Sequence, residues 1–348
     1  MKARIWLGIT IIMVIVMGIA GYVVVKQTKS SVLSPIGSVL TKEKPLEKYS
    51  IENLSKTTFT PSQIVFDVPT ATKSSYTVVP FSFVSNGKKV TGVAHLPMTP
   101  KSTKMPVVVQ FRGFVPKEIY APGVGTDHSA EVYAANGFLS LAPDFLGYGG
   151  SDKESENVFE SRFETYMTAL TLLSSIETIP FADTDHVFLW GHSNGGHIAL
   201  TVLSVVGEQG KNYPTTLWAP VTKRFPYSIL YYTDEADDYG KFLRKELAAF
   251  EKDYDVELYT FANYLGRITA PIQLHQGTAD PSVPEKWSSD FIASMKKIGK
   301  KVTYYTYPGA DHNLSSGPAS TRGDSSTRGG WNTVVARDIQ FFKSFLTN

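Results

Sequence analysis

Ser193 stands in the segment LWGHSNGGHIAL, with a glycine two positions away on either side. Apolar residues 187–190 before it predict a buried strand, and apolar residues at helical spacing over 198–203 predict a helix after it. A sharp turn between the two needs neighbours without side chains, which the segment supplies at Gly191, Gly195 and Gly196. Such a turn exposes a serine hydroxyl at a helix N-terminus, so the segment predicts a nucleophile. The alternative is a glycine-rich turn whose serine only caps the helix.

A serine hydroxyl needs a base to take its proton, and that base needs a carboxylate to orient it. His312 lies in the turn GADHNL, directly after the predicted strand VTYYTYP. Asp280 lies in the loop TADPSVP, directly after the predicted strand IQLHQG. The chain order of serine, acid and histidine is one of the known orders for a catalytic triad. We therefore predict that Ser193, Asp280 and His312 form a triad, with a helix cap near Glu285 as the alternative role of Asp280.

The other histidines have no comparable context. His192 and His197 flank the serine too closely along the chain to turn back as its base, so they are expected to pack or to line a pocket. His275 falls inside a predicted strand and is expected to be a core histidine. The remaining three precede the serine: His95, His128 and His186. Asp311 is rejected as the acid because adjacent residues rarely orient one another's side chains in the required way.

Negative charge on a tetrahedral intermediate requires backbone N–H donors. Asn194 follows the nucleophile at the start of the predicted helix and is expected to supply one donor. The second donor should come from the loop after the predicted strand 106–111, where FRGF places Phe114. We predict the amides of Asn194 and Phe114 as an oxyanion hole.

The elements that must position these residues alternate between strands and helices. A leading hairpin is predicted over residues 75–98, because two β-rich runs are joined by Asn86-Gly87. Strands are predicted at 106–111, 137–145, 186–193, 215–220, 272–277 and 302–308, with helices at 159–176, after Ser193, and at 286–299 and 331–346. This order predicts an α/β fold: a mostly parallel sheet with a leading antiparallel hairpin and helices on both faces.

Residues 221–264 interrupt this alternation with a polar, helix-prone segment. It is predicted either to be a small helical lid over the pocket or a solvated helical excursion. Its acidic residues could grip the free amine of a peptide, or could simply form a solvated face; these are Glu235, Asp237 and Asp238.

Residues 5–25 carry no charge and are strongly apolar. At a rise of about 1.5 Å per residue, such a helix spans a hydrocarbon core of about 30 Å. We predict an uncleaved membrane anchor within residues 1–30, with Lys2 and Arg4 on the inside and the catalytic part exported. A cleaved signal peptide, which would leave a secreted protein, and a buried core helix are the alternatives. Residues 31–74 are then a linker and N-terminal extension, and residues 75–348 the catalytic domain.

Composition removes several classes of function. The chain has 348 residues, of which 42% are hydrophobic and 19% charged, as in a globular protein. Its net charge of +2 gives no basic field for nucleic acid. It contains no cysteine, which excludes disulfides, thiolate metal sites and a cysteine nucleophile. The predicted chemistry requires neither a metal nor an organic cofactor.

The chain from about residue 75 resembles the α/β-hydrolases, and in detail the catalytic domain of the prolyl oligopeptidase family of serine peptidases and its esterase relatives. The matching segments are GHSNGG, APDFLGYGGSD, ITAPIQLHQGTADPSVP and YPGADH. The resemblance implies the triad of Ser193, Asp280 and His312. The usual His-Gly-Gly of the family is here Arg112-Gly113-Phe114, which is expected to place a cation near the mouth of the site. The chain before residue 75 has no room for the β-propeller of the oligopeptidases.

Three functions follow as hypotheses. The first is a serine hydrolase that acts through an acyl-enzyme on a small ester, amide or peptide. The second is a carboxylic-ester or lipid esterase at the membrane surface. The third is a non-catalytic binding domain on the same fold.

Overall fold

The computed structural model describes residues 43–98, 104–234, 236–316 and 329–346. The chain divides into two units, Met1–Pro45 and Leu46–Asn348, and the second holds every predicted site residue. The predicted membrane segment lies outside the described residues. Among the residues that are described, no helix combines the length and apolarity needed to span a bilayer.

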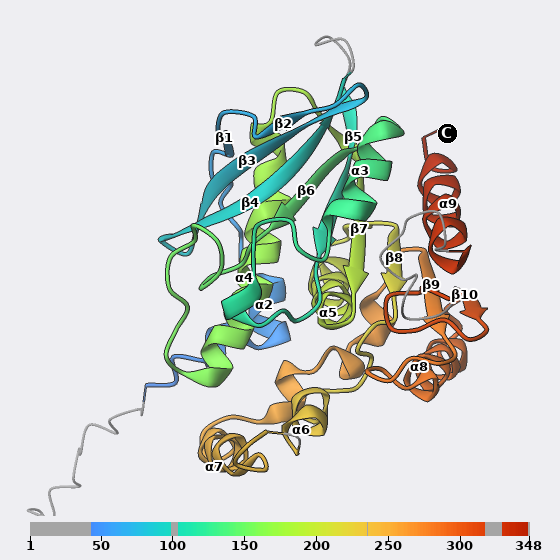
Figure 1. Cartoon of the computed structure of the whole chain (residues 1–348). Helices are drawn as coiled ribbons and strands as arrows, with labels where there is room; N and C mark the ends of the chain where they lie inside the picture. The colour runs from blue at the N-terminus through green and yellow to red at the C-terminus, as the bar shows by residue number, and fades with distance from the viewer. Residues whose placement is uncertain (1–42, 99–103, 235, 317–328, 347–348) are drawn as a thin grey trace, which may run out of the picture. The chain divides into compact units, whose positions relative to one another are not determined.

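A ten-stranded sheet forms the second unit's centre, in the order β1-β3-β4-β6-β5-β7-β8-β9-β10, with β2 paired to β3 (Figure 1). Strands β3, β4 and β6 pair antiparallel in that order, and the strands from β6 through β5, β7, β8 and β9 to β10 pair parallel. The bounds are β1 Val65–Phe66, β2 Ala71–Thr72, β3 Tyr76–Ser85, β4 Lys88–Pro97, β5 Met105–Phe111, β6 Leu139–Pro143, β7 Ala182–His192, β8 Thr215–Trp218, β9 Ile272–Gly277 and β10 Val302–Tyr307. The predicted α/β fold and its leading hairpin are confirmed. Asn86 and Gly87 both have positive φ at the hairpin turn, at 50° and 77°.

Helices cover both faces of the sheet because successive strand residues point to opposite sides. In β5, Val107 and Val109 face one core, while Val108 faces the other. The first core is closed by α2 Ile51–Lys56, α4 Val158–Ser175, α5 Asn194–Glu208 and α8 Glu285–Lys297. The second core is closed by α3 Asp127–Ala135 and α9 Gly329–Lys343.

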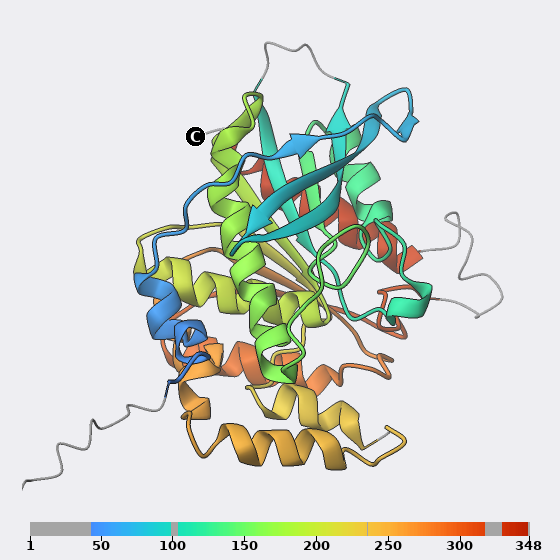
Figure 2. The same cartoon turned by 90° about the vertical axis from the view of Figure 1, so that its left-hand side faces the viewer.

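From Leu46 onward, the predicted linker and N-terminal extension contributes helices and strands to the second unit. A 3₁₀ turn, η1 Glu47–Tyr49, leads into α2, whose Ile51 and Leu54 are buried. Helix α2 lies against α5 (Figure 2), and Glu52 of α2 pairs with Arg267 at 2.6 Å. Strands β1 and β2 then extend the edge of the sheet beside β3. The helix has only six residues, so its apolar positions are too few to give a periodic signal among the Ser, Lys and Thr around them.

The insertion over residues 221–264 is helical. It contains α6 Tyr227–Thr233, α7 Lys241–Phe250, and the 3₁₀ turns η4 Val256–Tyr259 and η5 Phe261–Asn263; a further 3₁₀ turn, η6 Leu265–Arg267, follows it. Both views place α6 and α7 beyond the sheet edge at which β7 and β8 end (Figures 1 and 2). Phe250 and Tyr259 pack on the ring of Phe163 in α4, at 6.0 and 4.9 Å between centroids. An aromatic core therefore fastens one side of the insertion to α4.

His95 in β4 links burial to the pH dependence of stability. Its ring is 2% exposed, and burial lowers its pKa to about 4, against a partial opposing effect of Glu131. In the unfolded chain the pKa of a histidine is about 6.5, so the unfolded state binds more protons between these values. The free energy of unfolding should therefore fall as the pH drops from about 6.5 to 4. The full effect of His95 is on the order of 3 kcal/mol.

His95→Gln should make the free energy of unfolding less dependent on pH over this window. Urea unfolding at pH 7 and pH 4.5 measures the difference for the wild type and the variant. An equal loss in both proteins would show that His95 is not held neutral by burial. His186→Gln, at a half-exposed histidine paired with Asp183, is the matched control.

Candidate active site

Ser193 occupies a strained turn between β7 and α5. Strand β7 ends at His192, α5 begins at Asn194, and Ser193 between them has φ 56° and ψ −120°. Its amide donates to the carbonyl of Trp218 at 3.0 Å, and its own carbonyl accepts from the amides of Gly196 and Val221. The Ser193 side chain accepts no hydrogen bond from a helix amide, so the serine does not act as a side-chain cap of α5.

Two glycines make this turn possible. A Cβ at Gly195 would lie 1.7 Å from the carbonyl oxygen of Phe111, at the end of β5. A Cβ at Gly191 would lie 2.7 Å from the carbonyl oxygen of Gly195. Any side chain at these positions would push α5 away from the strands, so the glycines allow the close approach that presents Ser193.

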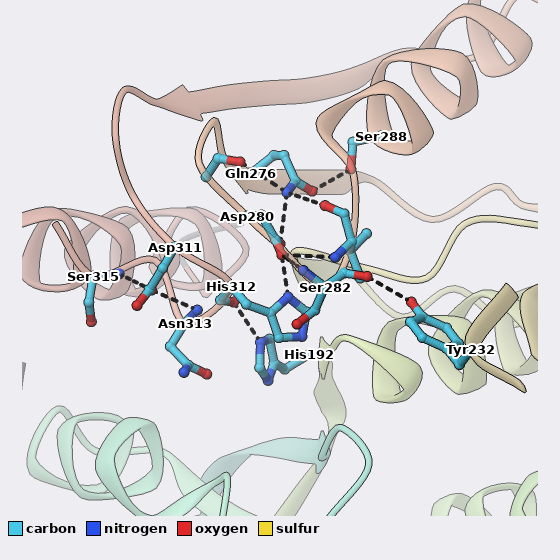
Figure 3. A network of polar contacts seen from close by, with 12 residues as sticks. His192, Tyr232, Gln276, Asp280, Ser282, Ser288, Asp311, His312, Asn313 and Ser315 are labelled. Carbon is cyan, nitrogen blue, oxygen red and sulfur yellow. Dashed lines mark hydrogen bonds and ion pairs between the residues drawn. The ribbon is translucent and has the colours of Figure 1, made fainter. Parts of the chain in front are cut away.

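Asp280 and His312 form a bonded pair in the loops after β9 and β10 (Figure 3). His312 Nδ1 lies 2.8 Å from Asp280 Oδ2, and the Asp280 side chain has no exposed surface. Asp280 Oδ1 accepts from the amides of Ser282 and Val283, both at 2.8 Å. Burial alone raises the pKa of the Asp280 carboxyl, but His312 and these two amides together hold that pKa below its usual value.

The alternative role of Asp280 as a helix cap does not match the structure. Helix α8 has Pro284 as its N-cap residue, with no side-chain cap. The two amides that Asp280 Oδ1 binds precede the helix. The carboxylate instead orients an imidazole, as a triad acid must.

The histidine loop lies over the serine turn, through the residue next to the nucleophile. His192 Nε2 lies 2.9 Å from the main-chain oxygen of His312, and the two rings are 4.7 Å apart between centroids. Because a carbonyl only accepts, His192 Nε2 carries the proton. Among the described residues no hydrogen bond joins Ser193 Oγ to His312, and such bonds often form only when substrate is bound. The pair is oriented, with His312 Nε2 as the ring nitrogen not bound to Asp280.

The predicted oxyanion loop passes directly beside the nucleophile. A Cβ at Gly113 would lie 3.0 Å from Ser193 Cβ. Over the described part of the chain, neither the Phe114 amide nor the Asn194 amide donates a hydrogen bond. The Phe114 side chain is 75% exposed. Both predicted donors are therefore available to a ligand, and their role stays a prediction.

Arg112 lines a pocket together with Phe114 and Asn194, so a cation does lie near the predicted oxyanion loop, but it is buried. It is 6% exposed, and its guanidinium lies over the rings of Tyr120 and Tyr148, at 4.5 and 4.1 Å. It donates to the carbonyls of Gly113 and Asp144, both at 3.0 Å. Arg112 thus fastens the oxyanion loop to the loop after β6.

Two of the other histidines are internal. His197 is fully buried, lies against the ring of Phe261, and bonds through Nδ1 to the carbonyl of Val221. His275 is fully buried in β9, with Tyr307 OH on one ring nitrogen and the Asp338 carboxylate 3.1 Å from the other. Both have the packing or core roles expected from the sequence.

Two side chains at the site were missed by sequence reasoning. His192 was expected only to pack or to line a pocket, and it also holds the loop of His312. Burial first, and the neighbouring His312 second, lower the pKa of His192 to about 4, so it stays neutral near pH 7. Gln276 donates to Asp280 Oδ2 at 3.0 Å. The sequence signal for a role of Gln276 at the site was its position, four residues before Asp280 and one before Gly277.

A serine on a glycine turn, with an acid and a histidine on successive strand ends of this sheet, defines an α/β-hydrolase. The sequence profile of the prolyl oligopeptidase family matches residues 125–331. The match spans more than half of the chain, which therefore belongs to the prolyl oligopeptidase family.

A curated relative is dipeptidyl peptidase family member 6 of Caenorhabditis elegans, 24% identical over 189 residues. That match covers 51% of this chain and only 24% of the relative, so the chain spans about a quarter of the relative's length. Acetyl xylan esterases of a Thermoanaerobacterium species and of Paenibacillus sp. R4 share the fold. They are 18% and 16% identical, with TM-scores of 0.56 and 0.61, and the matches cover 84% and 83% of this chain and 93% and 91% of theirs. The acylaminoacyl peptidase of Pyrococcus horikoshii is 17% identical with a TM-score of 0.56, over 78% of this chain and 42% of its own.

His192→Ala should slow the reaction of Ser193 with a fluorophosphonate by roughly tenfold, because one hydrogen bond to the base loop is lost. His192→Gln can donate from a similar position and should restore most of the rate. The second-order labelling rate at pH 7.5 measures both. His186→Ala, in the same strand but outside the site, is the control. Equal rates for His192→Ala and the wild type would show that the base loop needs no such bond.

Proposed function

We propose that the protein is a serine hydrolase that forms an acyl-enzyme on a small ester, amide or peptide. His312 Nε2 takes the proton of Ser193 as the hydroxyl attacks the carbonyl carbon, and later returns a proton to the leaving group. Asp280 holds the imidazole and stabilises its protonated form. The amides of Asn194 and Phe114 bind the oxyanion, and water then releases the acyl group by the same route.

The bond between Asp280 and His312 is the observation that carries this proposal. It fixes His312 with Nδ1 toward the acid, so Nε2 is the nitrogen left for a serine. A domain that only binds a ligand on this fold would need neither this orientation nor the strained Ser193. Both features together support catalysis over the binding-domain hypothesis.

A fluorophosphonate probe should label the folded wild type at one site. Ser193→Ala should abolish the labelling, and His312→Ala should slow it by roughly a thousandfold or more, since triad members act as a unit. Intact-protein mass spectrometry gives the stoichiometry and the rate. Ser289→Ala, at a hydroxyl on α8 that donates to Lys286 O, is the control. A folded wild type that takes up no probe would end the proposal.

An ester substrate is the second candidate, and chain coverage favours it. The alignments with the two acetyl xylan esterases extend over nearly the whole of those chains, but over less than half of the acylaminoacyl peptidase. The alternative of a peptide held by its free amine loses support at Asp238. That carboxylate accepts from the amides of Gly240 and Phe242 at the start of α7, as a local turn residue does.

p-Nitrophenyl acetate should be hydrolysed with a kcat/KM at least roughly a hundredfold above that of alanyl or prolyl p-nitroanilide, because the more reactive ester needs less transition-state stabilisation. Steady-state kinetics on both substrates, with Ser193→Ala as the blank, make the comparison. Turnover of either anilide equal to that of the ester would contradict the esterase candidate and support a peptidase.

A further inference from the structure

Gln276 lies behind the acid, at the end of β9, and has no exposed surface. Its Nε2 is within hydrogen-bond distance of Asp280 Oδ2 at 3.0 Å, and of the carbonyls of Gly277 and Val283, both at 3.2 Å. Its Oε1 accepts from Ser288 Oγ at 2.8 Å. Figure 3 shows this amide between the acid loop and α8.

These contacts fix the orientation of the amide. An ionised carboxylate and two carbonyls can only accept, so the nitrogen of Gln276 must face them and the oxygen must face Ser288. The Ser288 hydroxyl must then donate. Ser288 is itself fully buried in α8. A directed chain of donors therefore runs from α8 through β9 to the acid, from Ser288 through Gln276 to Asp280.

The chain ends on the oxygen that binds the base. Asp280 Oδ2 receives Gln276 Nε2 at 3.0 Å and His312 Nδ1 at 2.8 Å. Two donors on one carboxylate oxygen share its negative charge. The hydrogen bond from Gln276 therefore weakens the stabilisation that the carboxylate gives to a protonated imidazole. The same amide ties Val283, and so the far side of the acid loop, to β9.

We propose that Gln276, held by Ser288, is a positioning residue that sets both the direction and the strength of the Asp280–His312 bond. This inference rests on the proposed function for its effect on rate, but not for its effect on the bond. Gln276 does not touch the reacting atoms; it acts through Asp280.

The proposal fixes the sign of a pH effect. Gln276→Leu removes the second donor from Asp280 Oδ2, so the carboxylate stabilises the protonated form of His312 more strongly. The titration midpoint of His312 should then move to higher pH by roughly half a unit. In a plot of the fluorophosphonate labelling rate against pH, the low-pH limb should move to higher pH by the same amount. The rate on the high-pH plateau should fall roughly tenfold, because the acid loop loses its tie to β9.

Ser288→Ala keeps the glutamine and removes only the group that orients it. It should shift the midpoint in the same direction by less than Gln276→Leu does. The double variant should match Gln276→Leu alone, because the serine acts only through the amide. Ser289→Ala, the next residue of α8 with its hydroxyl on Lys286 O, is the matched control and should shift nothing.

The test uses the full chain and two readouts. Fluorophosphonate labelling rates from pH 5 to 9 give the low-pH limb of the rate profile. The titration midpoint of His312 comes from ¹⁵N NMR of histidine-labelled protein, with the signal assigned from His312→Gln, and this measurement needs no reaction. Thermal unfolding confirms that each variant is folded. If Gln276→Leu does not fold, Ser288→Ala carries the test.

The outcomes separate the two proposals. A wild type without Ser193-dependent labelling ends the proposed function, while the NMR midpoints still decide the role of Gln276. A slower but folded Gln276→Leu whose limb and midpoint stay in place would reduce the residue to packing and overturn the inference. Additive effects of the two substitutions would overturn the role of Ser288.

Discussion

The close approach of α5 to the ends of β5 and β7 is the constraint on which the site depends. It brings Gly195 so near the carbonyl of Phe111 that no side chain fits between them. It also forces Ser193 to a positive φ and brings Gly113 beside the serine. One steric condition thus places Ser193, the start of α5 and the loop of Gly113 together. The backbone strain at Ser193 is the cost of about 1 to 3 kcal/mol that such turns carry.

The acid and the base come together because their strands are neighbours. Strands β9 and β10 are parallel and in register, with Gln276 opposite Thr306 and Gly277 opposite Tyr307. Parallel strands end at the same edge of a sheet, so the two loops that follow must meet there. The bond between Asp280 and His312 is then a local consequence of strand pairing. The serine turn lies two strands away, and His192 provides the direct contact across that gap.

The sequence contains the signals for the elements and for the three proposed catalytic residues, but not for the residues that support them. Alternation of apolar runs predicts the strands, and each catalytic candidate follows a strand end, so topology alone places it at the right edge. Arg112 is different, because its aromatic partners, Tyr120 and Tyr148, come from loops without any period. Helix α2 is too short for a pattern. Gln276 reads as an ordinary strand residue until Asp280 and Ser288 are placed around it. Where the neighbours of a side chain come from segments without a periodic pattern, the sequence does not predict those neighbours.

The insertion between β8 and β9 reaches the same acid loop from the opposite side. Tyr232 OH of α6 donates to the carbonyl of Ser282 at 3.1 Å, two residues after Asp280 (Figure 3). The amide of Ser282 is one of the two that bind Asp280 Oδ1. The acid loop is therefore held by β9 through Gln276, which Ser288 of α8 orients, and by the insertion through Tyr232. Ser282 is thus the residue to which both α6 and Asp280 bond. In this arrangement the insertion is part of the support of the site as well as part of its surroundings.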